Sequence, residues 1–540
     1  MDVYRCSRRN FIIGLIGLRL SRHVLAASRG EVLYNGIRLS TPFPPRKDSL
    51  TPDPPELPPY LTAPPAVIPI DVGRQLFVDD FLIEKTTLKR TFHTTVYHPA
   101  TPVLKPDKPW EQEGGPTAMP FSDGVFYDPK DRLFKMWYMG GYLCSTCYAT
   151  SEDGIHWEKP QLDVVGGTNV VHTARRDSGT VWLDLEDNDP GRCYKMFLYD
   201  FKGGLSIHFS PDGIHWSEIA RTGPTGDRTT VFYNPFRKVW VFSLREYFPP
   251  PKGMGRCRRY WEHADVLAGA HWKAGEPPLW VGADSLDPVR DDLKTPCELY
   301  NLDCVAYESL LLGLFTIWRG QPADRAKPNE VCIGFSRDGF HWHRPDRRAF
   351  IPVSENYGDW NWGNVQSAGG CCLVVGDQLY FYVSGRAGVK GSPDSGVSTT
   401  GLAILRRDGF ASMDADAAGG TLITRPLSFG SRGSSRGFWL FVNANTQAGE
   451  LRVEVLDEKG MVIPPFTRAN CLPIRADKTK QVVRWQHARD LSSLKGKPVK
   501  LRFHLKNGSL FAFWVSPDKS GASHGYLAAG GPGFSGTKDE

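Results

Sequence analysis

The sequence lacks any extended run of lysine and arginine. Its formal net charge is +6, but four of these charges belong to residues 1–27, so the rest of the chain carries only +2. A nucleic-acid-binding surface needs clustered basic residues, and their absence argues against that class of partner and favours one without strong charge. The charged residues of the first segment are Arg5, Arg8, Arg9, Arg19 and Arg22, opposed by Asp2.

The sequence also has no apolar run near its start that could span a bilayer, because the stretch FIIGLIGL at 11–18 falls far short of the ~20 residues required. This stretch follows a basic segment and precedes small residues at Ala26 and Ala27, a pattern typical of an export signal over residues 1–27. The letters SRRNFI at 7–12 resemble a twin-arginine signal, with an ordinary secretory leader as the alternative. We expect a bacterial protein exported to the periplasm or beyond, without a membrane span in its mature chain.

Metal-binding spacing is missing as well. Cys144 and Cys147 form a lone CxxC, with no second CxxC and no matching histidine pair, so a zinc site is not expected. Most of the eleven cysteines lie in apolar runs, as Cys193, Cys304 and Cys332 do, which is typical of buried thiols. The sequence therefore requires no cofactor.

Glycine, proline and tryptophan are abundant, a balance typical of short strands joined by tight turns. The pattern SxDGxxW occurs as SEDGIHW at 151, SPDGIHW at 210 and SRDGFHW at 336. The first spacing is 59 residues and the second is 126, about twice as long, so one copy has diverged between them. Partial copies at 270–272 and 407–410 bring the number of units to five, each of 60–70 residues.

Each unit contains an apolar run, a polar turn and a second apolar run, at 124–141, 180–200, 230–246, 304–320 and 372–386. A third strand and the Asp-Gly turn follow, and the tryptophan can fold back between neighbouring sheets. Repeated four-stranded units predict an all-β fold, a five-bladed β-propeller followed by a C-terminal β-sandwich. We interpret SxDGxxW as a structural turn.

The chain divides into five expected parts. Residues 1–27 are the export signal, 28–70 a proline-rich lead-in, 71–417 the propeller, 418–520 the β-sandwich and 521–540 a glycine-rich tail expected on the surface. Residues 71–95 alternate like strands and are a candidate for the closing strand of the last blade.

Polar residues that precede the first strand of each blade should converge on the mouth of the central channel. Asp177 and Asp227 both lie four residues before a strand valine, Val181 and Val231. Neighbouring carboxylates raise one another's pKa, which separates a proton donor from an ionised partner, as glycoside cleavage requires. Further candidates for substrate binding are Glu111, Arg176, Arg228, Arg245, Glu298, Asn301, Asp303, Trp362 and Asn364. For each aspartate, the alternative is a turn-forming role, and for the tryptophan it is packing between blades.

The repeat, the segments FKMWY at 134–138 and PVLKPDKPWE at 102–111, and the C-terminal strands resemble the five-bladed propeller glycoside hydrolases of families thirty-two and forty-three. By this resemblance, Asp123 would be the nucleophile or base, Asp177 of the Arg-Asp-Ser segment 176–178 the transition-state stabiliser, and Asp227 the acid. The chain lacks the Asn-Asp-Pro-Asn-Gly signature and has Asp where the family has Glu at 227. The resemblance also allows a structural calcium ion in the channel, which no motif requires.

The expected function is that of an exported glycosidase acting on a poly- or oligosaccharide. Two alternatives stay open. One is a non-catalytic glycan-binding propeller, which the missing signature favours, and the other is a polysaccharide lyase, which needs a base beside an arginine or a metal. Sugar, linkage, stereochemical outcome and oligomeric state are left open by the sequence.

Overall fold

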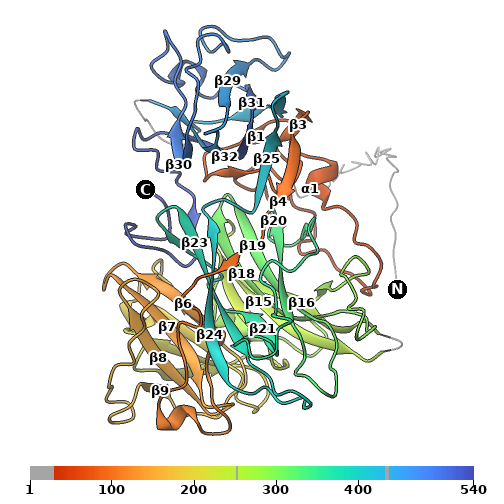
Figure 1. Ribbon diagram of the computed structural model, residues 1–540, viewed down its shortest axis with the longest axis vertical. Helices are drawn as coiled ribbons and strands as arrows, with labels where there is room; N and C mark the ends of the chain where they lie inside the picture. Colours follow the sequence, from red (N-terminus) through yellow and green to blue (C-terminus); the bar gives the residue numbers. More distant parts are fainter. Residues whose placement is uncertain (1–29, 251–252, 432–436) are drawn as a thin grey trace, which may run out of the picture.

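The computed structural model describes residues 30–250, 253–431 and 437–540, and the expected export signal lies outside these ranges. Nearly all regular structure is strand, with one four-residue helix, α1 (Pro59–Thr62), in the described ranges. Short 3-10 turns are η1 (Pro109–Glu111), η2 (Pro190–Arg192), η3 (Ala268–Ala270) and η4 (Ser492–Leu494). No helix in the part of the chain described is long and apolar enough to cross a membrane. The molecule has two parts stacked along its long axis (Figure 1).

The first three repeat units each form a four-stranded antiparallel sheet whose strands follow chain order, as the sequence predicts. The first sheet contains β6 (Ala118–Asp128), β7 (Leu133–Gly140), β8 (Ser145–Ser151) and β9 (Val170–His172). The second contains β10 (Gly179–Leu183), β11 (Tyr194–Leu198), β12 (Ser206–Ser210) and β13 (Ser217–Arg221). The third contains β14 (Thr230–Asn234), β15 (Val239–Phe248), β16 (Gly255–His263) and β17 (Leu279–Gly282).

The fourth and fifth sheets each include a strand from the C-terminal or the N-terminal part of the chain. The fourth contains β18 (Glu298–Glu308), β19 (Leu310–Trp318) and β20 (Glu330–Ser336), and the C-terminal β33 (Tyr526–Leu527) pairs with β18. The fifth contains β21 (Asn364–Ser367), β22 (Leu373–Val375), β23 (Gln378–Arg386) and β24 (Ser398–Arg406), and β5 (Val96–Tyr97) forms its outer edge. The outer strand of the fifth sheet thus comes from just beyond the candidate segment 71–95.

Neighbouring sheets contact one another in chain order, mostly through their first strands. β6 contacts β10, β10 contacts β14 and β14 contacts β18, while β21 lies against β19 on one side and β6 on the other. A hydrogen bond from the backbone N–H of Val125 to the carbonyl of Gly369 joins the first sheet to the segment after β21. These contacts connect the first sheet to both the second and the fifth.

Each SxDGxxW segment forms the same tight turn. In the second copy, Oδ1 of Asp212 accepts from the backbone N–H groups of Ile214 (2.8 Å) and His215 (2.9 Å), and Gly213 has φ of +79°. The carbonyl of Gly213 accepts a hydrogen bond from the indole N–H of Trp137 in the preceding sheet. These contacts give the repeated residues a structural role.

The second part of the molecule consists of two antiparallel sheets that share one hydrophobic core. One sheet has the order β30–β28–β32–β25–β4 with β2 beside β32, and the other has the order β29–β31–β26–β3. A parallel pair of β1 and β27 lies beside them. The strands are β1 (Ile68–Pro69), β2 (Gln75–Leu76), β3 (Ile83–Thr86), β4 (Lys89–Phe92), β25 (Ala411–Ala415), β26 (Gly420–Thr424), β27 (Leu427–Ser428), β28 (Trp439–Asn445), β29 (Glu450–Leu456), β30 (Asp477–Val482), β31 (Lys500–Lys506) and β32 (Gly508–Ser516).

Strands from the N-terminal segment belong to this second part, which differs from the expected domain boundary at residue 71. β3 and β4 lie among the C-terminal strands β31 and β25 in Figure 1, and β2 pairs with β32. Alternation along residues 71–95 shows that they form strands, but it carries no information about which sheet they join.

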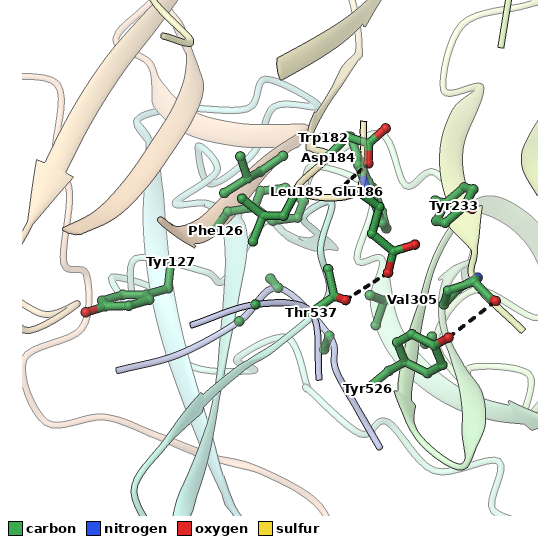
Figure 2. Close-up of a pocket in the computed structure, with 17 residues that line it drawn as sticks. Phe126, Tyr127, Trp182, Asp184, Leu185, Glu186, Tyr233, Val305, Tyr526 and Thr537 are labelled. Atoms are coloured by element: carbon green, nitrogen blue, oxygen red, sulfur yellow. Dashed lines mark hydrogen bonds between the residues drawn. The ribbon is translucent and has the colours of Figure 1, made fainter. Parts of the chain in front are cut away.

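The glycine-rich C-terminal segment 521–540 is another difference, because it packs into the molecule. Leu527 and Ala529 are buried, and the N–H of Tyr127 donates to the carbonyl of Ala529. Figure 2 shows this segment beside the far ends of β6, β10 and β18, where Thr537 donates to Glu186 at 2.9 Å. Small residues permit this approach, since a Cβ at Gly531 would lie 1.8 Å from a backbone carbonyl oxygen. The segment covers one end of the ring of sheets.

Candidate functional site

The opposite end of the sheets brings together the residues that precede their first strands. β10, β14, β18 and β21 begin at Gly179, Thr230, Glu298 and Asn364, and Arg386 pairs with Asn364 in the register of the fifth sheet. We call this end the mouth. Asp177 and Asp227 lie just outside the starts of β10 and β14, so they belong to neighbouring edges of the mouth.

A buried polar cluster joins the first strands below the mouth. One Asp303 carboxylate oxygen accepts from Ser367 Oγ (2.5 Å), Asn301 Nδ2 (2.8 Å) and Ser122 Oγ (3.1 Å), and Ser122 Oγ accepts from Arg228 Nη2 (3.0 Å). Burial raises the pKa of Asp303, although Arg228 and its hydroxyl partners act in the opposite direction. The cluster holds the Arg228 guanidinium in place without a direct ion pair.

The backbone at this cluster is strained. Ser122 and Arg228 are non-glycine residues with φ of +64° and +57°, in the left-handed region. Such residues each cost of order 1–3 kcal/mol and tend to gather at functional sites. The hydroxyl of Ser178 accepts from the backbone N–H of Arg228 at 2.7 Å, which fixes the conformation of that turn.

Asp177 has the properties of a proton donor. Its Oδ1 is enclosed and has no hydrogen-bond partner, while its backbone N–H donates to the carbonyl of Tyr199 at 2.9 Å. Burial raises the pKa of Asp177, and the nearby carboxylate of Asp227 raises it further, while Arg228 lowers it. The two carboxyl groups are thus close enough to influence each other, as the register of the sequence predicts.

Asp227 has a different environment. Its side chain is 41% exposed and lies 3.3 Å from Nη1 of Arg245. Burial raises the pKa of Tyr199, and the carboxylates of Asp227 and Asp177 add to this effect, which places the phenol in the same site. A solvated carboxylate therefore stands beside an enclosed carboxyl group, the division of roles that acid and base chemistry needs.

Asp123 and Arg176 form a buried ion pair with each other. Both are fully buried, both Asp123 oxygens accept from the Arg176 guanidinium, and Oδ2 also accepts from the N–H of Phe121 at 2.8 Å. Three hydrogen bonds thus engage the Asp123 carboxylate, and its partner Arg176 comes from the segment before β10. This arrangement favours a structural role for Asp123 over the nucleophilic role expected from the resemblance, which stays a prediction.

Glu111 is likewise engaged away from the mouth. Its carboxylate accepts from Tyr138 Oη (2.7 Å) and Lys159 Nζ (2.8 Å), and it is fully buried.

Asn364 Nδ2 donates to the carbonyl of Lys327, and Trp362 stacks on Arg325 at 4.7 Å with 8% of its surface exposed. These contacts fix Trp362 as part of the packing at the mouth.

Cations form the remaining wall of the mouth. The Arg228 and Arg386 guanidinium groups lie 3.8 and 5.3 Å from the ring of Phe121. Lys327 Nζ donates to Tyr300 Oη at 3.0 Å. Burial would raise the pKa of Tyr300, but Lys327 and the two arginines outweigh it, so the pKa lies below its usual value.

Two further arginines complete this wall. Arg256 pairs with Glu298 at 2.5 Å and stacks on Tyr300 at 5.2 Å. Arg258 donates to the carbonyl of Arg228 at 2.7 Å, and burial with the charge of Arg228 lowers the pKa of Arg258 to about 9.

Several of these residues were missed by sequence reasoning. Arg386 and Lys327 precede no first strand, and Tyr300 lies inside a strand. The signal that could have found Arg386 is its position opposite Asn364 at the end of the fifth hairpin.

Within the ranges that the structure describes, no group of three or more histidine, cysteine or acidic side chains is arranged to hold a metal ion. Asp303, the carboxyl at the centre, is surrounded by hydroxyl and amide donors. The structural calcium ion that the resemblance allows stays a prediction, and no step proposed for this chain uses a metal ion.

No protein-family model and no curated protein matches the chain. Solved structures match weakly. An N-acetylgalactosamine deacetylase from F. plautii in complex with blood group B trisaccharide is 12% identical over 63% of this chain and 97% of its own, with a TM-score of 0.36. A thermostable family-43 glycoside hydrolase is 11% identical over 59% of this chain and 100% of its own, with a TM-score of 0.36. An endo-arabinase from Bacteroides thetaiotaomicron is 12% identical over 54% and 97%, with a TM-score of 0.34. Similarities of this size carry no argument about the chemistry of this chain.

Proposed function

We propose that this chain is an exported glycoside hydrolase whose five repeated sheets are the blades of a β-propeller, followed by a β-sandwich to which both chain ends contribute strands. The ordered contacts between first strands, and the contact of β21 with β6, support a five-bladed ring. The basic and apolar pattern of residues 1–27 supports export to the periplasm or beyond.

One observation carries the catalytic proposal: an enclosed carboxyl with a raised pKa, Asp177, lies beside the solvated carboxylate of Asp227. Asp177 in its protonated form, in place of Asp227 to which the resemblance gives the role of the acid, donates its proton to the glycosidic oxygen as the bond from that oxygen to the anomeric carbon breaks. Asp227 in its ionised form acts on the anomeric carbon, either directly or by taking a proton from an attacking water. Arg245 Nη1 lies 3.3 Å from the Asp227 carboxylate and holds it in position.

The experiment is a product screen of the mature chain against a panel of poly- and oligosaccharides, with Asp177→Asn and Asp227→Asn as variants. A positioned acid or base contributes about 10²- to 10⁴-fold, so each variant should lose that much turnover and retain its fold and glycan affinity. Absence of turnover on every glycan, with binding retained, would support the non-catalytic glycan-binding alternative.

A second function is favoured by Tyr300, because a phenol with a lowered pKa beside Lys327 and close to Arg228 can act as a base next to cations. Such a site could remove a proton beside the carboxylate of a uronic acid and eliminate the glycosidic oxygen, which is lyase chemistry. An unsaturated product that absorbs in the ultraviolet distinguishes this reaction from hydrolysis, which yields none.

A further inference from the structure

The buried arginines of this chain fall into two groups. Nine arginines in the described residues are buried. Six of them have a carboxylate partner within 4.0 Å, and these are Arg74, Arg176, Arg319, Arg337, Arg344 and Arg407. Within the described ranges no ion pair involves the other three, which are Arg228, Arg258 and Arg386. All three belong to the mouth.

These three arginines also have unused hydrogen-bond donors. Among the described residues, Nε and Nη1 of Arg228, Nε of Arg258 and Nε of Arg386 are enclosed without a hydrogen-bond partner. An unpartnered Nε also occurs in four of the six paired arginines, so the three differ from them in lacking a carboxylate partner and, for Arg228, in a second unused donor. An uncompensated buried charge destabilises a protein by several kcal/mol, so folds usually pair such groups, as this one does at the six other positions. The three unpaired charges therefore point to a ligand that compensates them.

The charge balance of the mouth indicates the class of ligand. Arg228, Arg245, Arg256, Arg258, Arg386 and Lys327 face the carboxyl groups of Asp177, Asp227, Glu298 and Asp303. Burial favours the neutral form of two of these, Asp177 and Asp303. Only Asp227 and Glu298 lie against an arginine, so the mouth keeps a local excess of positive charge although the chain as a whole is close to neutral.

A cavity gives access to two of these cations. It has a volume of about 630 Å³ and is lined by Lys327 and Arg386 together with Tyr142, Gln321 and Ser395. A second cavity of about 490 Å³ shares Gly114 and Tyr142 with it and reaches Arg175, two residues before Asp177. The two cavities meet at Gly114 and Tyr142, and a short sugar chain could lie along them against Lys327 and Arg386.

We propose that Arg228, Arg386 and Lys327 form a subsite for an anionic group of the sugar chain, so that the enzyme takes an acidic glycan. The inference rests on the proposed function, since it names the substrate class of the same site. A uronic acid carboxylate and a sulfate ester present the same chemistry of negatively charged oxygens to these donors.

The test is calorimetric binding of three oligosaccharides of equal length to the mature full chain. The probes are an oligogalacturonide, the same oligosaccharide after reduction of its carboxyl groups to alcohols, and a sulfated galactan fragment. We expect the oligogalacturonide or the sulfated fragment to bind at least tenfold more tightly than the neutral one, with an affinity that falls as salt rises. Equal or tighter binding of the neutral probe would overturn the inference, while the ranking of the two anions identifies the source of the charge.

Variants locate the subsite. Arg386→Gln and Lys327→Gln should each weaken binding of the anionic probe roughly 10- to 100-fold, the range of a lost hydrogen bond to a charged group, and leave the neutral probe unaffected. Arg489→Gln is the matched control, because its side chain is 87% exposed in the second part of the molecule. If Arg386→Gln fails to fold, the partly exposed Lys327 carries the test alone, and unchanged affinity there overturns the proposal.

The two proposals fail separately. If the protein turns over a neutral glycan and shows no preference for the anionic probes, the proposed acidic substrate class is refuted and the proposed hydrolase activity is retained. If an anionic probe binds tightly but is not cleaved, the proposed catalytic function is refuted and the proposed anionic subsite is retained.

Discussion

Replacement of Asp177 by asparagine should lower turnover and raise stability at the same time. Asparagine keeps the shape of the side chain and removes its charge, and Oδ1 of Asp177 has no hydrogen-bond partner to lose. Burial raises the pKa of Asp177 above its usual value, so the folded state binds this proton more tightly than the unfolded state. The group therefore destabilises the fold once pH exceeds the unfolded pKa, and Asp177→Asn removes that cost at neutral pH.

Asp123→Asn is the matched comparison, because it makes the same chemical change at a paired carboxylate. Arg176 would remain fully buried and lose the one carboxylate that lies within 4.0 Å of it among the described residues. Loss of one partner of a buried ion pair costs about 3–5 kcal/mol of folding free energy. We therefore expect Asp123→Asn to be strongly destabilised and Asp177→Asn to be at least as stable as the parent chain.

Urea unfolding at pH 7 and at pH 3 measures both effects without any knowledge of the substrate. The advantage of Asp177→Asn should shrink as pH falls below the unfolded pKa of aspartate, ~3.9, because the parent carboxyl is then protonated in both states. A marked loss of stability in Asp177→Asn at pH 7, or an unaffected Asp123→Asn, would refute the assignment of one aspartate to chemistry and the other to structure.

One deletion, three substitutions and one pH measurement test the remaining assignments. Deletion of residues 521–540 should lower the melting temperature, since it exposes the buried ends of β6 and β18, whereas a surface tail would leave it unchanged. Gly213→Ala should cost about 1–3 kcal/mol more than Gly275→Ala in urea unfolding. Both glycines have φ near +79°, but only a Cβ at Gly213 meets a ring, that of Trp137 at 2.5 Å. Tyr300→Phe should reduce hydrolysis less than tenfold, and abolition of turnover would support the lyase instead. The alkaline limb of the activity profile should lie above the usual pKa of aspartate and vanish in Asp177→Asn, which pH-dependent kinetics can measure.

The repeated parts of the fold could be predicted from the sequence, whereas the parts that depend on a single long-range contact could not. Three copies of SxDGxxW predicted the turns and strand order because the same local hydrogen bonds recur at Asp153, Asp212 and Asp338. The register of Asp177 and Asp227 predicted their proximity for the same reason. By contrast, the pairing of Asp123 with Arg176 joins residues 53 positions apart in neighbouring sheets, and no spacing rule specifies that contact.

The cationic wall and the proton donor of the mouth act on each other. Arg228 and Arg386 lower the pKa of Asp177, in opposition to burial and to Asp227. An anionic group bound between these arginines would offset their effect, so the Asp177 proton would be held more tightly in the complex than in the free protein. Substrate binding would then strengthen the protonated state that cleavage consumes. The net charge of the sequence could not reveal this coupling. The coupling depends on the local balance of positive and negative charge among a few side chains, and these come from three of the sheets around one channel.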